Sequence, residues 1–142
     1  MLRAEPQTQI SVFLANRPGV VAHVCGALAE QGINIRAMTV LDTVDIGTMR
    51  MVVDDVEGAK RALDGSGAAY VEVPVISIPI PNTEGGFARI ARTLAGANVN
   101  IEYFYATATP NSEHTLGIFR VSDNDKALEI DLNGEAPRAA AS

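Results

Sequence analysis

Tryptophan is missing from this chain of 142 residues, and aromatic residues make up only 5% of it. Cysteine occurs once, at Cys25, so neither a disulfide framework nor a cysteine metal cluster can form within the chain. Positive charge is also scarce, because 11 lysine and arginine residues face 17 acidic ones and no basic cluster occurs. The resulting net charge of −6 disfavours nucleic acid and anionic membranes as partners, since both bind concentrated positive charge.

Long hydrophobic runs are absent as well. The start of the chain, MLRAEPQTQ, has no apolar signal core, and no segment approaches the length of a membrane span. The sequence therefore predicts a soluble, cytoplasmic protein. Its two histidines, His23 and His114, are both expected to be solvated and to form no metal site, and no cofactor is expected.

What the chain does contain is a repeat. Residues 16–35, NRPGVVAHVCGALAEQGINI, return sixty-six positions later as residues 82–101, NTEGGFARIARTLAGANVNI. The same offset relates the dipeptide Ile-Ser at residues 10–11 to its copy at residues 76–77. An offset that holds through a strand, a turn, a helix and a second strand indicates a duplicated module. Each copy spans roughly 70 residues, so we expect stability to depend on mutual packing of the copies or of two chains.

The alternation of apolar and polar residues predicts four strands and two helices in the first copy. After a loose leader at residues 1–6, the expected elements are a strand from residue 7, a helix between Pro18 and Gly32, strands at 33–41 and 48–53, a helix after Asp55 and a strand at 69–73. This order is βαββαβ. Two helices cannot cover both faces of a four-stranded sheet, so one face is expected to remain open.

The turn before the first helix is the most informative part of this copy. Pro18 is expected at an early helical position, where its missing N–H has no cost, and Asn16 is a candidate N-cap or turn residue. Gly19 allows the backbone to approach whatever lies over the turn. N–H groups at a helix start bind carboxylates or phosphates, although an ordinary capped turn could contain the same residues. The second copy keeps both Asn and Gly, which favours a binding turn.

No linker separates the copies, because the segment YVEVPVISIPI at residues 70–80 is apolar and only prolines interrupt it. We expect one module at residues 1–73 and the other at 74–142. The buried face of the second module's first helix is expected to contain Phe87, Ile90, Ala91 and Leu94. Its last helix is expected at residues 124–132. The remaining residues show no apolar alternation, so we expect this module to lack its own last strand and to end in a disordered tail.

These residues give the chain a family resemblance. NRPG, a helix, GINI and MRMVVDD resemble the ACT domain, and NTEGG, VNI and FRVSDNDKAL carry the same resemblance in the second copy. The resemblance covers residues 10–132 and looks most like small stand-alone proteins with tandem ACT domains. It implies an α+β fold of two ferredoxin-like βαββαβ modules, each with an antiparallel sheet and helices on one face. It also implies a regulatory protein that binds a free amino acid or a similar small effector at module interfaces.

According to this resemblance, ligand contacts come from the strand-to-helix turn of one module and from the second strand of its neighbour. In the first copy the matching residues are Asn16, Arg17, Pro18, Gly19, Val20, Val21, Asn34 and Ile35. In the second copy they are Asn82, Gly85, Gly86, Phe87, Asn100 and Ile101. The second turn has Thr83-Glu84 in place of Arg17-Pro18. It also has Gly86 in place of Val20, so we expect a more flexible turn and unequal occupancy of the two sites.

Other functions stay open beside an amino-acid sensor that acts on an enzyme or transporter in trans. A small enzyme would have to use His114 and Asp123, but the sequence shows no order of residues typical of nucleophilic catalysis, and no catalytic residue is expected. An RNA-binding sheet is suggested by Tyr103, Phe104 and Tyr105, yet the RNP-type signature is missing and the acidic balance opposes a phosphate backbone. A structural or interaction scaffold without ligand is the remaining alternative.

The expected assembly is a homodimer of chains in which the two modules pack with pseudo-twofold symmetry. The missing last strand leaves an edge in the second copy that a partner or the leader could cover. The open sheet faces would otherwise expose apolar patches.

Overall fold

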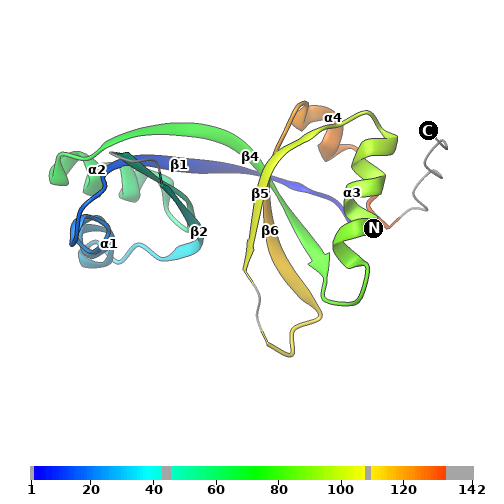
Figure 1. Ribbon diagram of the computed structural model, residues 1–142, viewed down its shortest axis with the longest axis horizontal. Coiled ribbons are helices and arrows are strands. Elements are labelled where there is room, and N and C mark those ends of the chain that lie inside the picture. Colours follow the sequence, from blue (N-terminus) through cyan, green and yellow to red (C-terminus); the bar gives the residue numbers. More distant parts are fainter. Residues whose placement is uncertain (1, 43–45, 108–109, 134–142) are drawn as a thin grey trace. The chain divides into compact units, whose positions relative to one another are not determined.

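Figure 1 shows a computed structural model of the protein, which describes residues 2–42, 46–107 and 110–133. Its elements, in chain order, are β1 (Glu5–Ala15), α1 (Val20–Glu30), β2 (Ile35–Asp42), β3 (Ile46–Val53), α2 (Val56–Ser66), β4 (Ala69–Pro81), α3 (Gly86–Gly96), β5 (Ile101–Thr107), β6 (His114–Val121) and α4 (Asn124–Leu128). The chain divides into two compact units. We call residues 8–73 the first module, and residues 1–7 together with 74–142 the second module.

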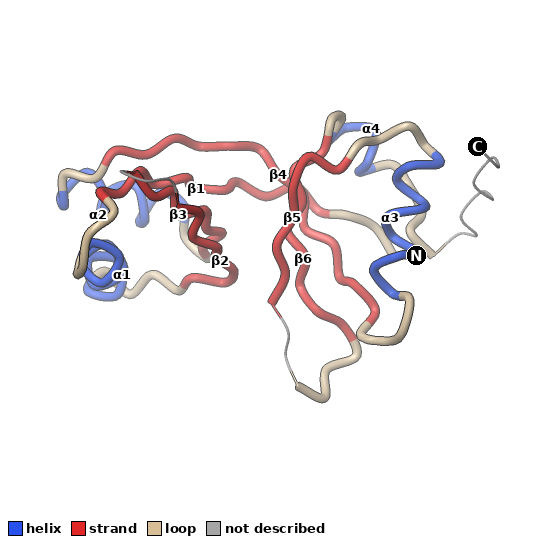
Figure 2. Tube along the Cα trace, viewed as in Figure 1, coloured by secondary structure: helices blue, strands red, loops and turns tan. Residues whose placement is uncertain are grey.

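Each module contains four neighbouring strands. In the first module their order is β2-β3-β1-β4, and in the second it is β1-β4-β6-β5, because β1 and β4 each contribute one part to each module. Both orders place the first strand of the βαββαβ unit between its third and fourth strands. In Figure 2 the helices of each module lie on one side and its strands on the other. The predicted α+β fold of two ferredoxin-like modules is therefore confirmed.

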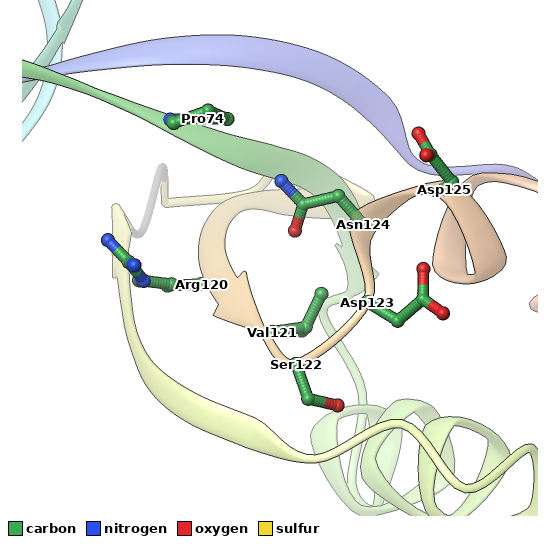
Figure 3. Close-up of a pocket in the computed structure, with 7 residues that line it drawn as sticks. All are labelled: Pro74, Arg120, Val121, Ser122, Asp123, Asn124 and Asp125. Carbon is green, nitrogen blue, oxygen red and sulfur yellow. The ribbon is translucent and has the colours of Figure 1, made fainter.

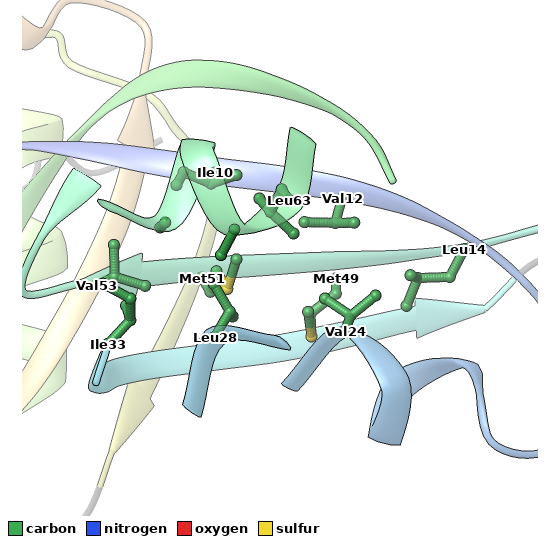
Figure 4. Close-up of a cluster of buried hydrophobic side chains, with 12 residues drawn as sticks. Ile10, Val12, Leu14, Val24, Leu28, Ile33, Met49, Met51, Val53 and Leu63 are labelled. Carbon is green, nitrogen blue, oxygen red and sulfur yellow. The ribbon is translucent and has the colours of Figure 1, made fainter. Parts of the chain in front are cut away.

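The core of the first module lies between the sheet and its two helices (Figure 4). Ile10 and Val12 alternate along β1 and pair with Met51 and Met49 of β3, so that all four side chains face the helices. Each of these four residues is fully buried. The side chains that cover them from α1 and α2 are Val24, Leu28, Ala59, Ala62 and Leu63. In this part of β1 and β3, every second residue is apolar and faces the helices. This alternation is the signal by which the sequence predicted the strands of the module.

The first residues of the chain are part of the second module, so the expectation of a loose leader is wrong. Ala4 is only 7% exposed and packs with Leu2 into the second core. The N–H of Leu132 donates to the carbonyl of Leu2 at 2.9 Å, and the amide of Gln7 donates to the hydroxyl of Ser77 at 3.1 Å. The beginning of β1 thus occupies the place of the fourth strand in the second module. Residues 1–7, assigned from the sequence to the module at 1–73, cluster with the other module instead.

Other boundaries also differ from the prediction. β4 is one continuous strand from Ala69 to Pro81, and α4 ends at Leu128 because Ile130 and Leu132 pack back onto the second core. Phe87 was expected on the buried helix face but is 37% exposed. The predicted tail at residues 134–142 lies outside the described residues. Within the described ranges, no helix is both long enough and apolar enough to span a bilayer.

Candidate functional site: the two strand-to-helix turns

The turn of the first module is built around Gly19. This residue has φ 88° and ψ −11°, a left-handed conformation that glycine adopts without steric cost, and it is the N-cap of α1. Asn16 is consequently a turn residue rather than the N-cap. Pro18 precedes the cap and does not occupy an early helical position as predicted, because α1 begins only at Val20.

The start of α1 keeps free donors. Its first helical hydrogen bond runs from the N–H of His23 to the carbonyl of Gly19 at 2.9 Å, and no side chain caps the helix. The N–H groups of Val20 and Val21 come before this bond and have no helical acceptor. A Cβ atom built on Gly19 would meet no atom within 4 Å, so the space over the turn is open. That space is a hollow of about 410 Å³ lined by Arg17, Pro18, Gly19, Val20 and His23.

The end of β2 lies beside this turn. The side-chain amide of Asn16 donates to the carboxylate of Asp42 at 3.0 Å, and both residues are exposed. β1 and β2 both pair antiparallel with β3, so they run in the same direction and α1 returns the chain between them. The end of β2, not its beginning, is therefore the part next to the turn. Sequence reasoning missed Asp42, although the βαβ order of the elements implies this position.

Asn34 and Ile35 lie at the opposite end of the first module. The N–H of Asn34 donates to the carboxylate of Asp54 at 3.0 Å, and the N–H of Asp54 donates back to the carbonyl of Asn34 at 3.1 Å. α1 has 11 residues, which corresponds to a length of about 16 Å between the turn and this pair. Within the first module, the structure does not bring these two predicted site residues to the turn.

The turn of the second module has the same backbone and a tighter environment. Gly85 is the N-cap of α3 with φ 76° and ψ 1°, and the N–H of Arg89 donates to its carbonyl at 3.0 Å. Asn82 is anchored to the following hairpin, because its side chain donates to the carbonyl of Ser112 at 3.0 Å. Gly86 is buried, and a Cβ atom there would lie 2.1 Å from the carbonyl oxygen of Pro81. The expected flexibility at Gly86 is wrong, since this glycine permits close packing of the helix start against the end of β4.

Asn100 and Ile101 repeat the arrangement seen at Asn34 and Ile35. The N–H of Asn100 donates to the hydroxyl of Ser122 at 2.9 Å, and the N–H of Ser122 donates to the carbonyl of Asn100 at 2.9 Å. This pair again lies at the end of the module away from its turn. The strand residue beside the second turn is Phe104, whose ring stacks on that of Phe87.

A further hollow, of about 440 Å³, lies at the junction of β6 and α4 (Figure 3). It is lined by Pro74, Arg120, Val121, Ser122, Asp123, Asn124 and Asp125. Arg120 donates to Glu102 at 3.0 Å, and Asp123 caps α4 by accepting from the N–H of Lys126 at 3.0 Å. These two bonds stabilise the edge of the sheet and the start of α4. The side-chain oxygen Oδ1 of Asn124 is buried and accepts no hydrogen bond within the described residues.

The side chains with displaced pKa values form no reactive cluster. A hydrogen bond to Glu72, together with the charge of Glu57, raises the pKa of Lys60 on the surface of α2. A hydrogen bond to Asp64 at 2.8 Å raises the pKa of Tyr70. In residues 2–42, 46–107 and 110–133, no three or more His, Cys, Asp or Glu side chains gather in a way that could hold a metal ion.

The turns and strand order are those of a known pair of domains. A family model described as "ACT domain pair" matches residues 6–136. The chain belongs to this family. A comparison with curated proteins gave no match.

Solved structures agree with this assignment. Protein BT0572 from Bacteroides thetaiotaomicron has 32% sequence identity to the ACT pair and a TM-score of 0.83, over 89% of this chain and 86% of that one. The ligand-free regulatory subunit of aspartate kinase from Thermus thermophilus has 23% identity and a TM-score of 0.61, over 82% and 85% of the two chains. The corresponding subunit from Thermus flavus has 24% identity and a TM-score of 0.57, over 84% and 83%. At these identities, the two kinase subunits support the fold alone.

Proposed function

We propose that this ACT pair is a sensor of a free amino acid and regulates an enzyme or transporter in trans. The observation that carries the proposal is the first turn, where uncapped N–H groups of α1 border an open hollow that Arg17 also lines. A carboxylate is the ligand group that suits such a site. The helix start supplies hydrogen-bond donors with a partial positive charge, and Arg17 supplies a full one.

The other half of an amino acid is an ammonium group, which needs an acceptor. Asp42 is held beside the turn by its hydrogen bond with Asn16, and a carboxylate has room for more than one donor. We infer that the ligand lies between the start of α1 and the end of β2, with its ammonium group toward Asp42. Asn34 and Ile35 belong to this site only if they come from a neighbouring module.

The second turn is the poorer site. Glu84 is exposed there and would repel a carboxylate, whereas the first turn has Pro18 at the same place in the repeat. Gly86 is packed against Pro81, so the start of α3 has little room to adjust. We therefore assign the main site to the first turn.

A second copy of the chain is the neighbour that fits best. β2 and β5 are the two ends of the strand order, so each has a paired strand on one side only. Met38 and Val40 on β2 are 38% and 47% exposed, and Phe104 on β5 is 44% exposed. Apolar side chains on unpaired edges favour association, and a homodimer would cover them.

A thermal-unfolding screen with the twenty amino acids tests this function. An amino acid at about 100 times its Kd should stabilise the fold by roughly 2.7 kcal/mol, or about 5 to 10 °C in Tm. Arg17→Gln should reduce the shift, since it removes the cation beside the hollow. Arg92→Gln removes an exposed arginine from α3 of the second module and should leave the shift unchanged. No shift with any of the twenty would leave a scaffold without ligand as the function.

A further inference from the structure

Two strands pass from one module into the other. β1 begins in the second module with residues 5–7 and continues in the first with residues 8–15. β4 begins in the first module with residues 69–73 and continues in the second with residues 74–81. Each strand thus starts as the fourth strand of one βαββαβ unit and ends as the first strand of the other.

Side chains on or just before each of these strands contribute to both cores. Leu2 and Ala4, just before β1, pack into the second core, while Ile10, Val12 and Leu14 of β1 pack into the first. Residues on and just before β4 are divided between the cores in the same way. Ala68 and Tyr70 pack against the first core, and Ile76, Ile78 and Ile80 form part of the second.

The position of β1 therefore matters to both modules. A shift of β1 by one residue would turn Ile10 and Val12 away from the first core. It would also displace Leu2 and Ala4, which precede the strand, from the second core. The hydrogen bonds from Leu132 to Leu2 and from Gln7 to Ser77 hold its beginning, and the pairing with β3 holds its end.

Each of these strands also leads directly into a candidate binding turn. β1 ends at Ala15, immediately before the turn at residues 16–19, and the N–H of Arg17 donates back to the carbonyl of Ala15 at 2.9 Å. β4 ends at Pro81, immediately before Asn82, and Pro81 is the residue against which Gly86 packs. A turn in one module is thus the continuation of a strand that completes the other.

We propose that β1 and β4 are coupling strands, which make the two modules one folding unit and transmit the state of each turn to the module in which the strand begins. The folding part of this proposal is independent of any ligand. The part that concerns the turns rests on the proposed function. Coupling of this kind is reciprocal, so a change that stabilises or destabilises one end of β1 must change the stability of the other end in the same direction.

Hydrogen exchange of the full chain, measured by mass spectrometry, tests the folding part. Ala4→Asp places a carboxylate in the second core, and Ala4→Ser is a milder change in case the first variant does not fold. The readouts are peptides from β3 of the first module and β6 of the second, because neither strand is shared. We expect exchange at least tenfold faster in both peptides. Pro6→Asp adds the same charge at an exposed position two residues away and should change neither.

Faster exchange in β6 with wild-type rates in β3 would overturn the proposal, since the modules would then unfold separately. Wild-type rates in both peptides of Ala4→Asp would overturn it too, because the residues that lead into β1 would then not support the second module. The reciprocal variant is Leu14→Ala, which changes the first core at the end of β1. Leu14→Ala should speed hydrogen exchange at the N–H of Leu132, which belongs to the second module and lies more than fifty positions after the end of the first module in the sequence.

An amino acid found in the thermal screen provides the ligand arm of the test. Its addition should slow exchange at Leu132, whose N–H donates to Leu2. A ligand that protects α1 but leaves Leu132 unchanged would contradict coupling through β1 and leave the proposed function intact. If no amino acid binds, the proposed function fails, while the Ala4 variants still decide whether the modules are coupled.

Discussion

The ring of Phe87, at the start of α3, stacks on the ring of Phe104 in the middle of β5, with centroids 4.4 Å apart and planes inclined by 21°. Phe119 of β6 continues the stack, at 5.4 Å from Phe104 and 6.2 Å from Phe87. The first two rings are 37% and 44% exposed, whereas Phe119 is fully buried. The stack therefore fastens the beginning of α3, and with it the second turn, to the edge strand of the module.

Phe104→Ala should destabilise the protein by about 1 to 3 kcal/mol. The loss combines the half-buried ring area with the stacking contribution of roughly 0.5 to 1.5 kcal/mol. Phe13→Ala is the matched control, because Phe13 on β1 is 45% exposed but contributes no ring to this stack. Urea denaturation should show the larger loss for Phe104→Ala. Equal losses would mean that the stacking adds nothing beyond buried area.

Gly86→Ala should cost about 1 to 3 kcal/mol of unfolding free energy. The added methyl group would overlap the carbonyl oxygen of Pro81, so either α3 or the end of β4 must move. Gly26→Ala is the matched change in α1, where a Cβ atom would meet nothing within 4 Å. It should stabilise the protein by about 0.5 to 1 kcal/mol, since alanine is the better helix former. Gly86→Ala with wild-type stability would show that the start of α3 is not tightly packed.

Gly19→Ala and Gly85→Ala should separate backbone strain from ligand binding. Both glycines have positive φ, 88° and 76°, and open space where a Cβ atom would lie, so each substitution should cost about 1 to 2 kcal/mol. Only Gly19→Ala places a methyl group in the proposed site. The Tm shift caused by a bound amino acid should therefore fall in Gly19→Ala and persist in Gly85→Ala. An equal fall in both variants would contradict the assignment of the main site to the first turn.

Much of the fold could be predicted because the repeat and the period-two strands are local signals. Ile10, Val12 and Leu14 on one face of β1, and the cap residue Asp55 before α2, follow directly from the sequence. The role of Leu2 and Ala4 could not be read in this way. Two small or apolar residues in a polar leader form no pattern of their own, and the core into which they pack is formed by residues distant in sequence, from Ile76 to Leu132.

The candidate site was predicted only in part, and for a geometrical reason. Gly19 and Gly85 were identified because both copies keep a glycine in the turn, where the backbone can approach a ligand closely. The structure shows in addition that both are helix N-caps with positive φ. Asn34 and Asn100 were predicted as ligand contacts because the ACT resemblance implies contacts from the second strand of a neighbouring module. Within its own module, each has a structural role. Asn34 forms two hydrogen bonds with Asp54, and Asn100 forms two with Ser122, in each case at the end of the module away from the turn. To predict that Asp42 and Phe104 lie near the turns, the direction of β2 and β5 relative to the preceding strands would also have been needed.

The thiol of Cys25 should be a poor nucleophile in the folded protein. It is half-buried against the first core, and burial raises its pKa above the ordinary value of 9.0. Since the folded pKa is the higher one, the stability linked to this group is fully present below about pH 9.0 and is lost as the pH rises through the folded pKa. Iodoacetamide should therefore react much more slowly with native than with urea-denatured protein at pH 8 to 9. Equal rates would indicate an accessible thiolate.

The edge strand β2 is the expected interface of the homodimer. This strand pairs only with β3 and exposes Met38 and Val40, which point to the same face because they are two residues apart. If a second copy covers this edge, Val40→Lys should convert the dimer to a monomer, since a lysine on an edge strand opposes pairing with another chain. Val71→Lys introduces the same charge at a valine of β4 that is also 47% exposed, and it should leave the dimer intact. Light scattering at micromolar concentration measures the mass in each case. A monomeric wild-type protein would contradict the homodimer, and no second copy could then contribute to the proposed site. A Val40→Lys variant that remains dimeric would show that the interface does not include β2.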